Sequence, residues 1–467
     1  MYAHNEKASL SGERIAVLGG GVSGTSLALL AAKKGADVLL SDAKKIPDTT
    51  VGAMKASGVA YEEFGHTDAV LACDRAVTSS GFPPSADIIK RIIDRGLPIT
   101  GELDFVAPYL KGRFIGVTGS NGKTTTTSLL GWLLRRLDPG GFKVATVGNI
   151  GSAIADIAGE EHSYIVAELS SFQLYWSRSL VLDGAIVTNI APDHIDWHGS
   201  YKNYTAAKAK ILSFVRPEKN GASGFTITRE SELDILKPDR GRSLSLAWGE
   251  PREKGTPGHI LLSSALRRAC LDDEELFRFD DTSLLGGHNM ENVAMAMAAV
   301  SALGVNPKTA RNGLASYVPP PHRCSMALVA GGVKYIDDSK GTNVAATVTA
   351  LSSIDGRKII ILGGRGKGED YGALVAPLLM YAKSAILIGE ASGEIANALE
   401  KGGYKNFTIA SGMEEAVRSA HSSAAPGDVV LLSPACTSWD AYNNYGERGE
   451  HFASLVREIA GGKDARN

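Results

Sequence analysis

The 467-residue chain has no long hydrophobic run, no closely spaced cysteines and no excess of charge of either sign. Its longest apolar stretch, residues 293–305, is too short and too rich in Ala and Ser to span a bilayer, so we expect no membrane partner. Four scattered cysteines without a CxxC pair argue against a structural zinc site and a disulfide framework, and they fit a reducing cytoplasm. A net charge of −2 offers nucleic acid no bulk attraction. Residues 1–7 lack the apolar segment of a signal peptide, which also favours a cytoplasmic location.

The most informative feature that is present is a glycine-rich loop at residues 119–125. It follows a β-like run at 114–118 and opens a helix, whose unpaired N–H groups and partial positive charge favour anions. Gly119, Ser120, Asn121, Gly122, Lys123, Thr124 and Thr125 form it. Its glycines permit close approach to phosphate, its lysine reaches terminal phosphates and its first threonine can face Mg²⁺. The loop therefore predicts a nucleoside triphosphate site.

Length and pattern predict an α/β protein of three domains, at 1–101, 102–319 and 320–467. Strand-like runs alternate with helical ones, which is typical of parallel sheets with ligands at the carboxyl ends of the strands. The runs are 14–18, 37–40 and 76–78, then 114–118, 164–167 and 184–188, then 334–337, 358–362, 385–388 and 429–432. The polar stretch 218–281 predicts short strands and loops, and a helix is expected at 289–303. Prolines at 319–321 mark the last boundary.

A second glycine pattern, GxGxxG at 19–24, follows the first expected strand, and Asp42 ends the next one. This arrangement suits a dinucleotide, with Asp42 on a ribose. The pattern is weak by itself, because a tight turn needed only for packing looks the same. Either NAD(P) or another nucleoside diphosphate fits the N-terminal domain.

Polar residues follow the strands of the central segment. Glu168 ends one strand beside the phosphate loop, where a carboxylate can hold Mg²⁺. A loop after the next strand carries Asp193, His194, Asp196 and His198, a cluster that favours catalysis or metal binding. Lys208 and Lys210 are two apart on an expected helix, so at most one enters a site, and local sequence alone favours solvated lysines.

Two further groups of polar residues suit a nucleotide and an anionic substrate. Asn289 and Asn292 lie three apart on a helix, where two amides can read adenine or position phosphate. In the third segment, conspicuous polar loops occupy 321–323, 337–343, 363–368 and 433–440. Their basic residues suit a second, anionic substrate and the charge of a transferring phosphoryl group.

Together these motifs resemble those of the Mur ligases of peptidoglycan synthesis across essentially the whole chain. The shared motifs are GSNGKTT, ELSSFQL, DHID, AAK, GHNxxN, HR, DSKxTN, SPACxS and RGExF. The DNPR motif of the diaminopimelate-adding and lysine-adding members is missing. The motifs are most similar to those of the D-glutamate-adding members.

The resemblance implies a Rossmann-like UDP-binding domain, a central P-loop ATPase domain and a Rossmann-like C-terminal domain. It implies ATP, two Mg²⁺ ions and a carbamate on Lys208 as cofactors, and UDP-N-acetylmuramoyl-L-alanine and D-glutamate as substrates of a monomer. Lys123, His194, Lys208 and Lys340 would be catalytic, and Thr124, Glu168, His194 and Lys208 would hold the metal ions. ATP would contact residues 119–125, Asn289, Asn292, His322, Arg323, Asp338 and Lys340. The UDP-sugar would contact Ser23, Asp42, Ser80, Gly81 and Asn149, and D-glutamate would contact Thr342, Lys367, Ser438 and Tyr445.

Two departures concern the amino-acid pocket: Arg365 stands where some relatives carry an acid, and Trp439 replaces a smaller apolar residue. The resemblance implies phosphorylation of a carboxylate, attack by an amine and closure of the third domain. Two other classes remain open, an NAD-dependent oxidoreductase and a nucleotide-dependent switch, besides a ligase for another amino acid.

Overall fold

The computed structural model describes residues 9–137, 141, 143–217, 223–250 and 258–461. Residues 1–7 and parts of the polar stretch 218–281 thus lie outside the described residues. The chain divides into two compact units, the first made of residues 1–282 and 291–317, the second of 283–290 and 318–467. Within the described ranges, no helix is long and apolar enough to cross a bilayer.

The first unit contains a five-stranded parallel sheet with the strand order β3-β2-β1-β4-β5. Its strands are β1 (Arg14–Leu18), β2 (Asp37–Ser41), β3 (Ala60–Glu62), β4 (Arg75–Thr78) and β5 (Ile99–Gly101). Its helices are α1 (Val22–Lys33), α2 (Asp48–Ala56), α3 (Asp87–Asp94) and α4 (Glu102–Val106). The strand order reverses between β1 and β4, and such a switch point is where open α/β sheets bind ligands.

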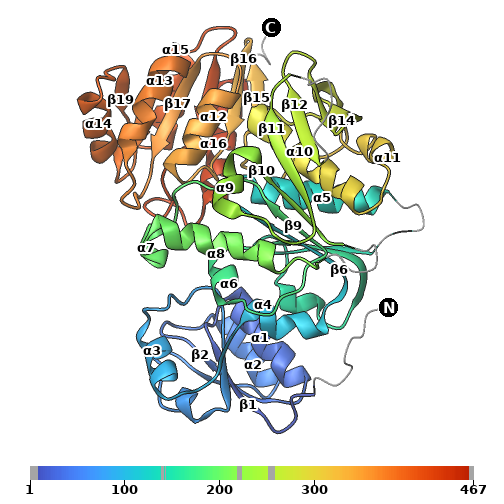
Figure 1. Cartoon of the computed structure of the whole chain (residues 1–467). Coiled ribbons are helices and arrows are strands. Elements are labelled where there is room, and N and C mark those ends of the chain that lie inside the picture. The colour runs from blue at the N-terminus through green and yellow to red at the C-terminus, as the bar shows by residue number, and fades with distance from the viewer. Residues whose placement is uncertain (1–8, 138–140, 142, 218–222, 251–257, 462–467) are drawn as a thin grey trace. The chain divides into compact units, whose positions relative to one another are not determined.

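Both faces of this sheet are buried because its central strand is apolar at every inner position. Ile15 and Val17 pack in one core cluster with residues of α1 and α2. Ala16 and Leu18 face the opposite way and pack with Ile88 and its neighbours on α3. Helices therefore cover both faces, as Figure 1 shows for the blue part of the chain.

The first unit also contains a nine-stranded mixed sheet, ordered β14-β13-β12-β11-β10-β9-β6-β8-β7. Among the described strands, two pairings at one edge of this sheet are antiparallel: β12 with β13, and β13 with β14. The strands are β6 (Lys111–Thr118), β7 (Val144–Gly148), β8 (Glu161–Glu168), β9 (Gly184–Val187), β10 (Phe225–Arg229), β11 (Arg242–Trp248), β12 (His259–Ser263), β13 (Arg268–Leu271) and β14 (Glu274–Arg278). The helices are α5 (Lys123–Arg136), α6 (Ser171–Trp176), α7 (Ile195–His198), α8 (Tyr201–Ser213), α9 (Leu233–Leu236), α11 (Pro307–Arg311) and the part of α10 (Gly287–Ala302) that begins at Glu291.

Helix α10 is the most completely buried of these helices. Residues 293–300 all have 0% exposed surface. A helix that is apolar on every side has no solvent face, which explains the run of Ala, Met and Val at 293–300.

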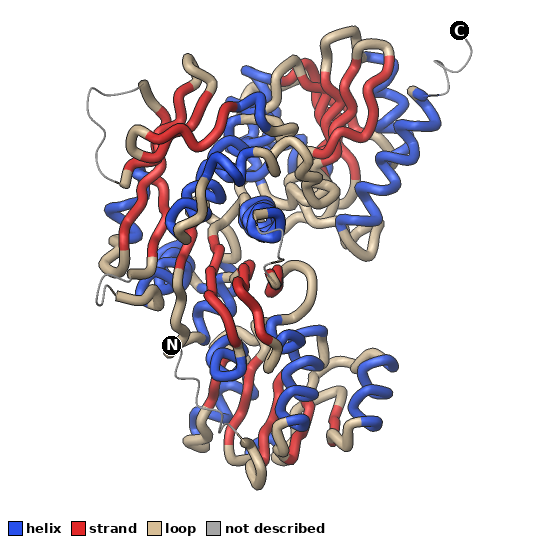
Figure 2. The backbone as a smooth tube through the Cα atoms, turned by 90° about the vertical axis from the view of Figure 1, so that its right-hand side faces the viewer, coloured by secondary structure: helices blue, strands red, loops and turns tan. Residues whose placement is uncertain are grey.

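The second unit is built on a six-stranded sheet ordered β15-β16-β20-β17-β18-β19, parallel except for β15 with β16. Its strands, red in Figure 2, are β15 (Ser325–Ala330), β16 (Val333–Asp337), β17 (Lys358–Gly363), β18 (Ala382–Ile388), β19 (Phe407–Ile409) and β20 (Val429–Leu432). The helices are α12 (Val344–Ser353), α13 (Val375–Tyr381), α14 (Ser392–Lys401), α15 (Met413–Ser423) and α16 (Tyr445–Ile459). Two core clusters fill the two faces, one with α12 to α14 and one with α15 and α16.

The three sheets, each packed against helices, confirm the predicted α/β fold class. The predicted parallel sheets are antiparallel at one edge in two of the three cases, where hairpins extend them. Within the polar stretch 218–281, the predicted short strands are β10 to β14. The domain limits 1–101, 102–319 and 320–467 stay a prediction.

Candidate active site

The phosphate-loop sequence joins β6 to α5, and its backbone conformation requires glycine. Gly119 and Gly122 have φ values of 143° and 80°, which L side chains rarely adopt. A Cβ at Gly119 would overlap the Thr188 hydroxyl, and one at Gly122 would overlap the Asn292 amide. The loop is also held from outside, because the Asn121 N–H donates to Asn189 Oδ1 at 2.9 Å. The loop shape is therefore fixed by neighbouring elements as well as by its own sequence.

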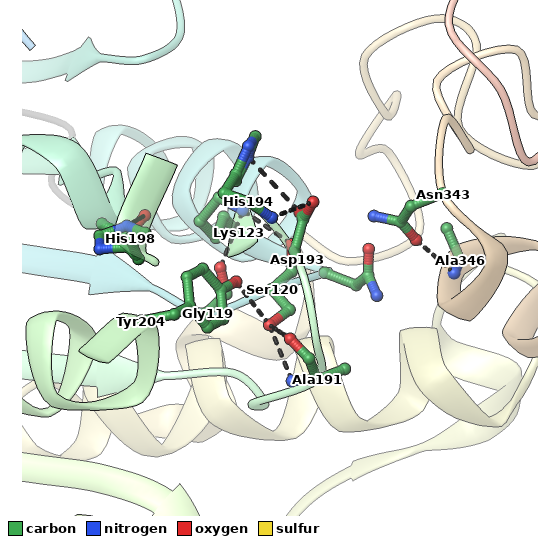
Figure 3. Close-up of polar contacts among 12 residues, drawn as sticks. Gly119, Ser120, Lys123, Ala191, Asp193, His194, His198, Tyr204, Asn343 and Ala346 are labelled. Atoms are coloured by element: carbon green, nitrogen blue, oxygen red, sulfur yellow. Dashed lines mark hydrogen bonds and ion pairs between the residues drawn. The ribbon is translucent and has the colours of Figure 1, made fainter. Parts of the chain in front are cut away.

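Lys123 opens α5 and turns back over the loop. Its Nζ donates to the carbonyl oxygens of Gly119 and Ser120, both at 2.8 Å (Figure 3). The Ser120 hydroxyl lies 2.8 Å from Tyr204 Oη and donates to the Ala191 carbonyl oxygen. This places an ammonium group at the loop and helix N-terminus, a combination that attracts phosphate.

A carboxylate and a hydroxyl lie together beside this loop. Glu168, at the end of β8, has 1% exposed surface, and its Oε2 accepts a hydrogen bond from Thr124 Oγ1 at 2.6 Å. Its Oε1 accepts from Asn149 Nδ2 at 3.2 Å. The structure thus brings together two predicted metal ligands, and it places Asn149, predicted for the UDP-sugar, on the same carboxylate.

The loop cluster Asp193, His194, Asp196 and His198 does not converge on one point. His194, with a left-handed φ of 51°, has its Nε2 3.5 Å from Asp193 Oδ2. Asp196 is exposed, whereas His198 is buried against Ser171, whose Oγ lies 2.9 Å from its Nε2. Burial lowers the pKa of His198 to about 4, so this ring is neutral near pH 7. In the described part of the chain, no group of three or more His, Cys, Asp or Glu forms a metal cluster.

Lys208 departs most from what local sequence indicates. Its side chain on α8 is 2% exposed, so the local interpretation of a solvated lysine is wrong for this residue. Its Nζ donates to the Gly119 carbonyl oxygen at 2.7 Å. Burial, reinforced by the positive charge of Lys123, holds the pKa of this amine well below its ordinary range. Lys210 lies on a different face and donates to the Tyr175 carbonyl oxygen, so only one of the two lysines approaches the loop.

The glycine pattern at residues 19–24 lies at the switch point of the five-stranded sheet. Asp42 Oδ2 accepts from the Gly20 N–H at 2.6 Å, and Oδ1 accepts from the Lys44 N–H at 2.8 Å. Ser80 and Gly81 follow the neighbouring strand β4, and Ser23 begins the first turn of α1. Four of the five residues predicted for the UDP-sugar therefore gather at the carboxyl ends of β1, β2 and β4.

Helix α10 carries the two predicted asparagines, and both are buried. In the first unit, Asn292 Oδ1 accepts from Thr126 Oγ1 at 3.3 Å, which places it beside the phosphate loop. In the second unit, Asn289 Nδ2 donates to the Leu285 carbonyl oxygen at 2.8 Å.

The second unit gathers its predicted residues around the carboxyl ends of β16 and β20. His322 Nδ1 lies 2.6 Å from Asp337 Oδ2, and Ser433 Oγ donates to Asp338 Oδ2 at 2.8 Å. Burial raises the pKa of the Asp338 carboxyl group to about 7. Lys340 Nζ donates to Tyr445 Oη at 2.9 Å, so a predicted ATP ligand and a predicted D-glutamate ligand are in contact.

A buried guanidinium group forms hydrogen bonds with the loops that follow β16 and β20. Arg448, on α16, is 1% exposed and donates to the Ser339 hydroxyl, the Ser339 carbonyl oxygen and the Cys436 carbonyl oxygen. Burial lowers its pKa to about 10, so it stays charged near neutrality. Arg448 begins the shared motif RGExF, which by itself assigns this residue no role.

The remaining predicted residues of the second unit lie on loops. Ser438 is 2% exposed and Lys367 is exposed, while Thr342 and Arg323 are half-buried. Of the two departures, Arg365 forms a bidentate pair with Glu390, both N–O distances being 2.9 Å. Trp439 is 63% exposed. Main-chain bonds between Arg365 and Thr437 join the loops that carry Lys367 and Ser438.

Several residues that hold the site are not among those predicted from the sequence. Two of them, Thr188 and Asn189, hydrogen-bond to the phosphate loop. Thr188 Oγ1 and Asn189 Nδ2 both donate to the Asn121 carbonyl oxygen. Their position in the sequence indicates such a role, because both lie at the end of the predicted strand 184–188, where ligand-binding loops begin. Tyr204 stands one helical turn before Lys208, so it shares that residue's face.

Comparisons with known proteins match three successive parts of the chain. Three family models match: "MurD N-terminal domain" at residues 14–88, "Mur ligase middle domain" at 117–300 and "Mur ligase, glutamate ligase domain" at 322–436. The UDP-N-acetylmuramoylalanine--D-glutamate ligase of Pelotomaculum thermopropionicum is 34% identical over 96% of this chain and 98% of its own. The ligase of the same name from Elusimicrobium minutum is 34% identical over 97% and 100%. The crystal structure of UDP-N-acetylmuramate-alanine ligase from Thermotoga maritima has the same fold, with a TM-score of 0.57 at 18% identity, covering 96% of this chain and 99% of that one.

Proposed function

Since this chain belongs to the Mur ligase family, we propose that it is an ATP-dependent ligase that joins D-glutamate to UDP-N-acetylmuramoyl-L-alanine in peptidoglycan precursor synthesis. The relatives named as D-glutamate ligases match nearly the full chain. Their names support this substrate pair over the substrates of other Mur ligases. The cytoplasmic location and the monomeric state expected from the sequence belong to the same proposal.

One observation carries the proposal: a buried lysine amine, whose surroundings disfavour the charged form, lies on the phosphate loop. Lys208 Nζ contacts Gly119, and the Glu168–Thr124 pair belongs to the same loop region. A simple phosphate-binding loop has no need of a second lysine there, and a buried ammonium is costly. A neutral amine is the form that reacts with CO₂ to give a carbamate, which exchanges a potential cation for an anionic oxygen ligand.

The Thr124 hydroxyl and the Glu168 carboxylate fit magnesium, which prefers oxygen ligands. Thr124 and Glu168 would hold one Mg²⁺, and His194 with carbamylated Lys208 would hold the second. When bound, the ions neutralise phosphate oxygens during transfer.

The chain's own residues would bind and orient the reactants. The loop N–H groups and Lys123 hold the ATP phosphates, while the loops after β1 and β4 hold the UDP-sugar. The L-alanine carboxylate oxygen attacks the γ-phosphorus, and the bond to the leaving ADP oxygen breaks, giving an acyl phosphate. The D-glutamate amine attacks the acyl carbon, loses a proton and expels inorganic phosphate, leaving an amide. Lys367, Tyr445 and Ser438 would hold the anionic amino acid.

Product formation tests the proposal directly. The purified chain is incubated with ATP, Mg²⁺ and UDP-N-acetylmuramoyl-L-alanine, with D-glutamate, L-glutamate or no amino acid, and ADP and the amide product are measured. We expect stoichiometric ADP and amide with D-glutamate only. Amide formation with a different amino acid would indicate another Mur-type ligase, and ADP release without any acceptor would indicate a nucleotide switch. Binding of NADH without any ligase product would favour the oxidoreductase interpretation.

A further inference from the structure

Glu232 is a buried carboxyl group that the proposed chemistry does not use. It lies after β10, at the end of a short 3₁₀ helix (Glu230–Glu232), and has 8% exposed surface. Its Oε1 accepts a hydrogen bond from the Ile190 N–H at 2.9 Å, whereas its Oε2 is buried with no hydrogen-bond partner among the described residues. The neighbouring guanidinium group of Arg229 pairs with Glu291 instead. Burial away from water opposes the charged form of Glu232 and raises the pKa of its carboxyl group.

The contact between Glu232 and Ile190 joins the loops that follow two neighbouring strands. Strands β9 and β10 pair in parallel, with Phe225 opposite Gly184, so the carboxyl ends of both strands lie at the same edge of the sheet. Ile190 follows β9 and Glu232 follows β10, although the two residues are 42 positions apart in the sequence. Local sequence gives no sign of this contact, because it depends on the pairing of the two strands.

Ile190 stands between two residues that hold the phosphate loop. On one side, Asn189 accepts the Ser120 N–H on its carbonyl oxygen at 2.8 Å and the Asn121 N–H on its Oδ1 at 2.9 Å. On the other side, the Ala191 N–H donates to Ser120 Oγ, and Ser120 Oγ donates to the Ala191 carbonyl oxygen, both at 2.8 Å (Figure 3). The Ile190 N–H itself donates to the buried carboxyl group after β10. This short segment is therefore held by the phosphate loop through its outer residues and by the carboxyl group through its middle one.

We propose that Glu232 is a positioning residue for ATP: its carboxyl group holds the segment 189–191 in the place from which this segment shapes the phosphate loop. The role rests on the proposed function, under which the phosphate loop binds the ATP phosphates. Loss of the carboxyl group leaves the Ile190 N–H without its acceptor, and the segment moves to regain one. The phosphate loop is then no longer preformed, so binding of the nucleotide weakens because the loop must be ordered at the same time.

The test compares substitutions of Glu232 with a matched glutamate of the same 3₁₀ helix. Glu232→Leu keeps the bulk of the side chain but removes the acceptor, whereas Glu232→Gln keeps an acceptor oxygen in the same place. Glu230→Gln is the control, because the Glu230 side chain is exposed and its Oε2 lies 3.6 Å from His259 Nε2. Calorimetry gives the dissociation constants of a non-hydrolysable ATP analogue with Mg²⁺ and of UDP-N-acetylmuramoyl-L-alanine, each measured alone. KM and kcat are measured with all three substrates.

We expect Glu232→Leu to raise the dissociation constant of the ATP analogue and the KM for ATP about tenfold, the size of effect expected from one lost hydrogen bond. Its kcat and its dissociation constant for the nucleotide-sugar should stay within about threefold of the wild type, as should every constant of Glu232→Gln and Glu230→Gln. Hydrogen exchange at the amides of Ile190, Ser120 and Asn121 should accelerate in Glu232→Leu alone, because these N–H groups donate to Glu232 and Asn189.

Several results would overturn the role. These are unchanged binding of the ATP analogue by a folded Glu232→Leu chain, an equal loss in Glu232→Gln, or an equal loss of affinity for the nucleotide-sugar. If Glu232→Leu does not fold, Glu232→Asp replaces it, because the shorter side chain draws the carboxyl group back from the Ile190 N–H. Equal binding of the ATP analogue by Glu232→Asp, Glu232→Gln and the wild type then rejects the role. A wild-type chain that does not bind the ATP analogue at all rejects the proposed function, and the positioning role with it.

Discussion

Lys208 shows how burial changes the chemistry of a single side chain. On the surface this amine would be an ammonium ion, but next to Lys123 and away from water it favours the neutral form. Two residues further on, Lys210 keeps its amine near the surface and contacts only a carbonyl oxygen. The two lysines form a natural pair for comparison, because they share a helix and differ in environment.

We predict that Lys208→Ala lowers turnover by about three orders of magnitude while the chain still folds, because a ligand for the second metal ion is lost. A short carboxylic acid added to the assay should restore part of the activity by replacing the carbamate oxygens. Lys210→Ala should keep nearly full turnover. Near-normal turnover of Lys208→Ala would reject the carbamate role.

Lys123 acts at the phosphates, where each charge contact matters in the transition state. We expect Lys123→Ala to reduce kcat/KM by about 10³-fold, as for other lost phosphate clamps. Phosphate release under saturating nucleotide-sugar measures this, and circular dichroism checks the fold. A loss of less than tenfold would contradict the assignment.

His198 makes the stability of the chain depend on pH. Its pKa is about 4 in the folded chain against an ordinary value of 6.5, so the unfolded chain takes up a proton first as the pH falls. Stability is therefore complete above about pH 6.5 and is lost progressively down to about pH 4, by about 3 kcal/mol. Denaturant titrations of the wild type and His198→Gln measure this loss, and the variant should show less of it. His451→Gln, at an exposed histidine of α16, should behave as the wild type.

At the scale of elements, packing between a strand and the following helix fixes the conformation of the loop that joins them. The glycine loop at residues 19–24 is the clearest case. A Cβ on Gly24 would overlap the Gly19 carbonyl oxygen, because α1 packs directly against the end of β1. A Cβ on Gly21, at the cap of the same helix, would meet nothing within 4 Å.

This difference predicts opposite tolerance to alanine within one motif. Gly24→Ala should reduce the free energy of unfolding by about 1–3 kcal/mol, since helix and strand must move apart. Gly21→Ala should cost less than about 1 kcal/mol, the usual effect of a changed cap. Urea denaturation followed by circular dichroism measures both. Equal losses would mean that the helix does not pack as closely as the structure indicates.

At the scale of the whole molecule, the two compact units have separate cores and carry different parts of the proposed chemistry. The loops assigned to the UDP-sugar belong to the first unit, and Lys340, Ser438 and Tyr445 belong to the second. A ligand stabilises the unit that binds it.

Calorimetry should therefore resolve more than one unfolding transition. UDP-N-acetylmuramoyl-L-alanine at a hundred times its dissociation constant should stabilise the first unit by about 2.7 kcal/mol and raise only its transition temperature. Hydrogen exchange assigns each transition to its unit. A single transition that shifts as a whole would show that the units unfold cooperatively.

The sequence by itself determined the fold class, the phosphate loop and the family. These properties depend on local patterns: apolar runs of strand length, glycines before a lysine and motifs in a fixed order. The tertiary structure decided which of several similar side chains have a special environment. It buried Lys208 and left Lys210 half-buried, turned the His198 ring toward Ser171, and placed the Glu102 carboxyl group against the Gln173 amide. Burial and contacts between distant segments set these differences, and neither is encoded within a short stretch of chain.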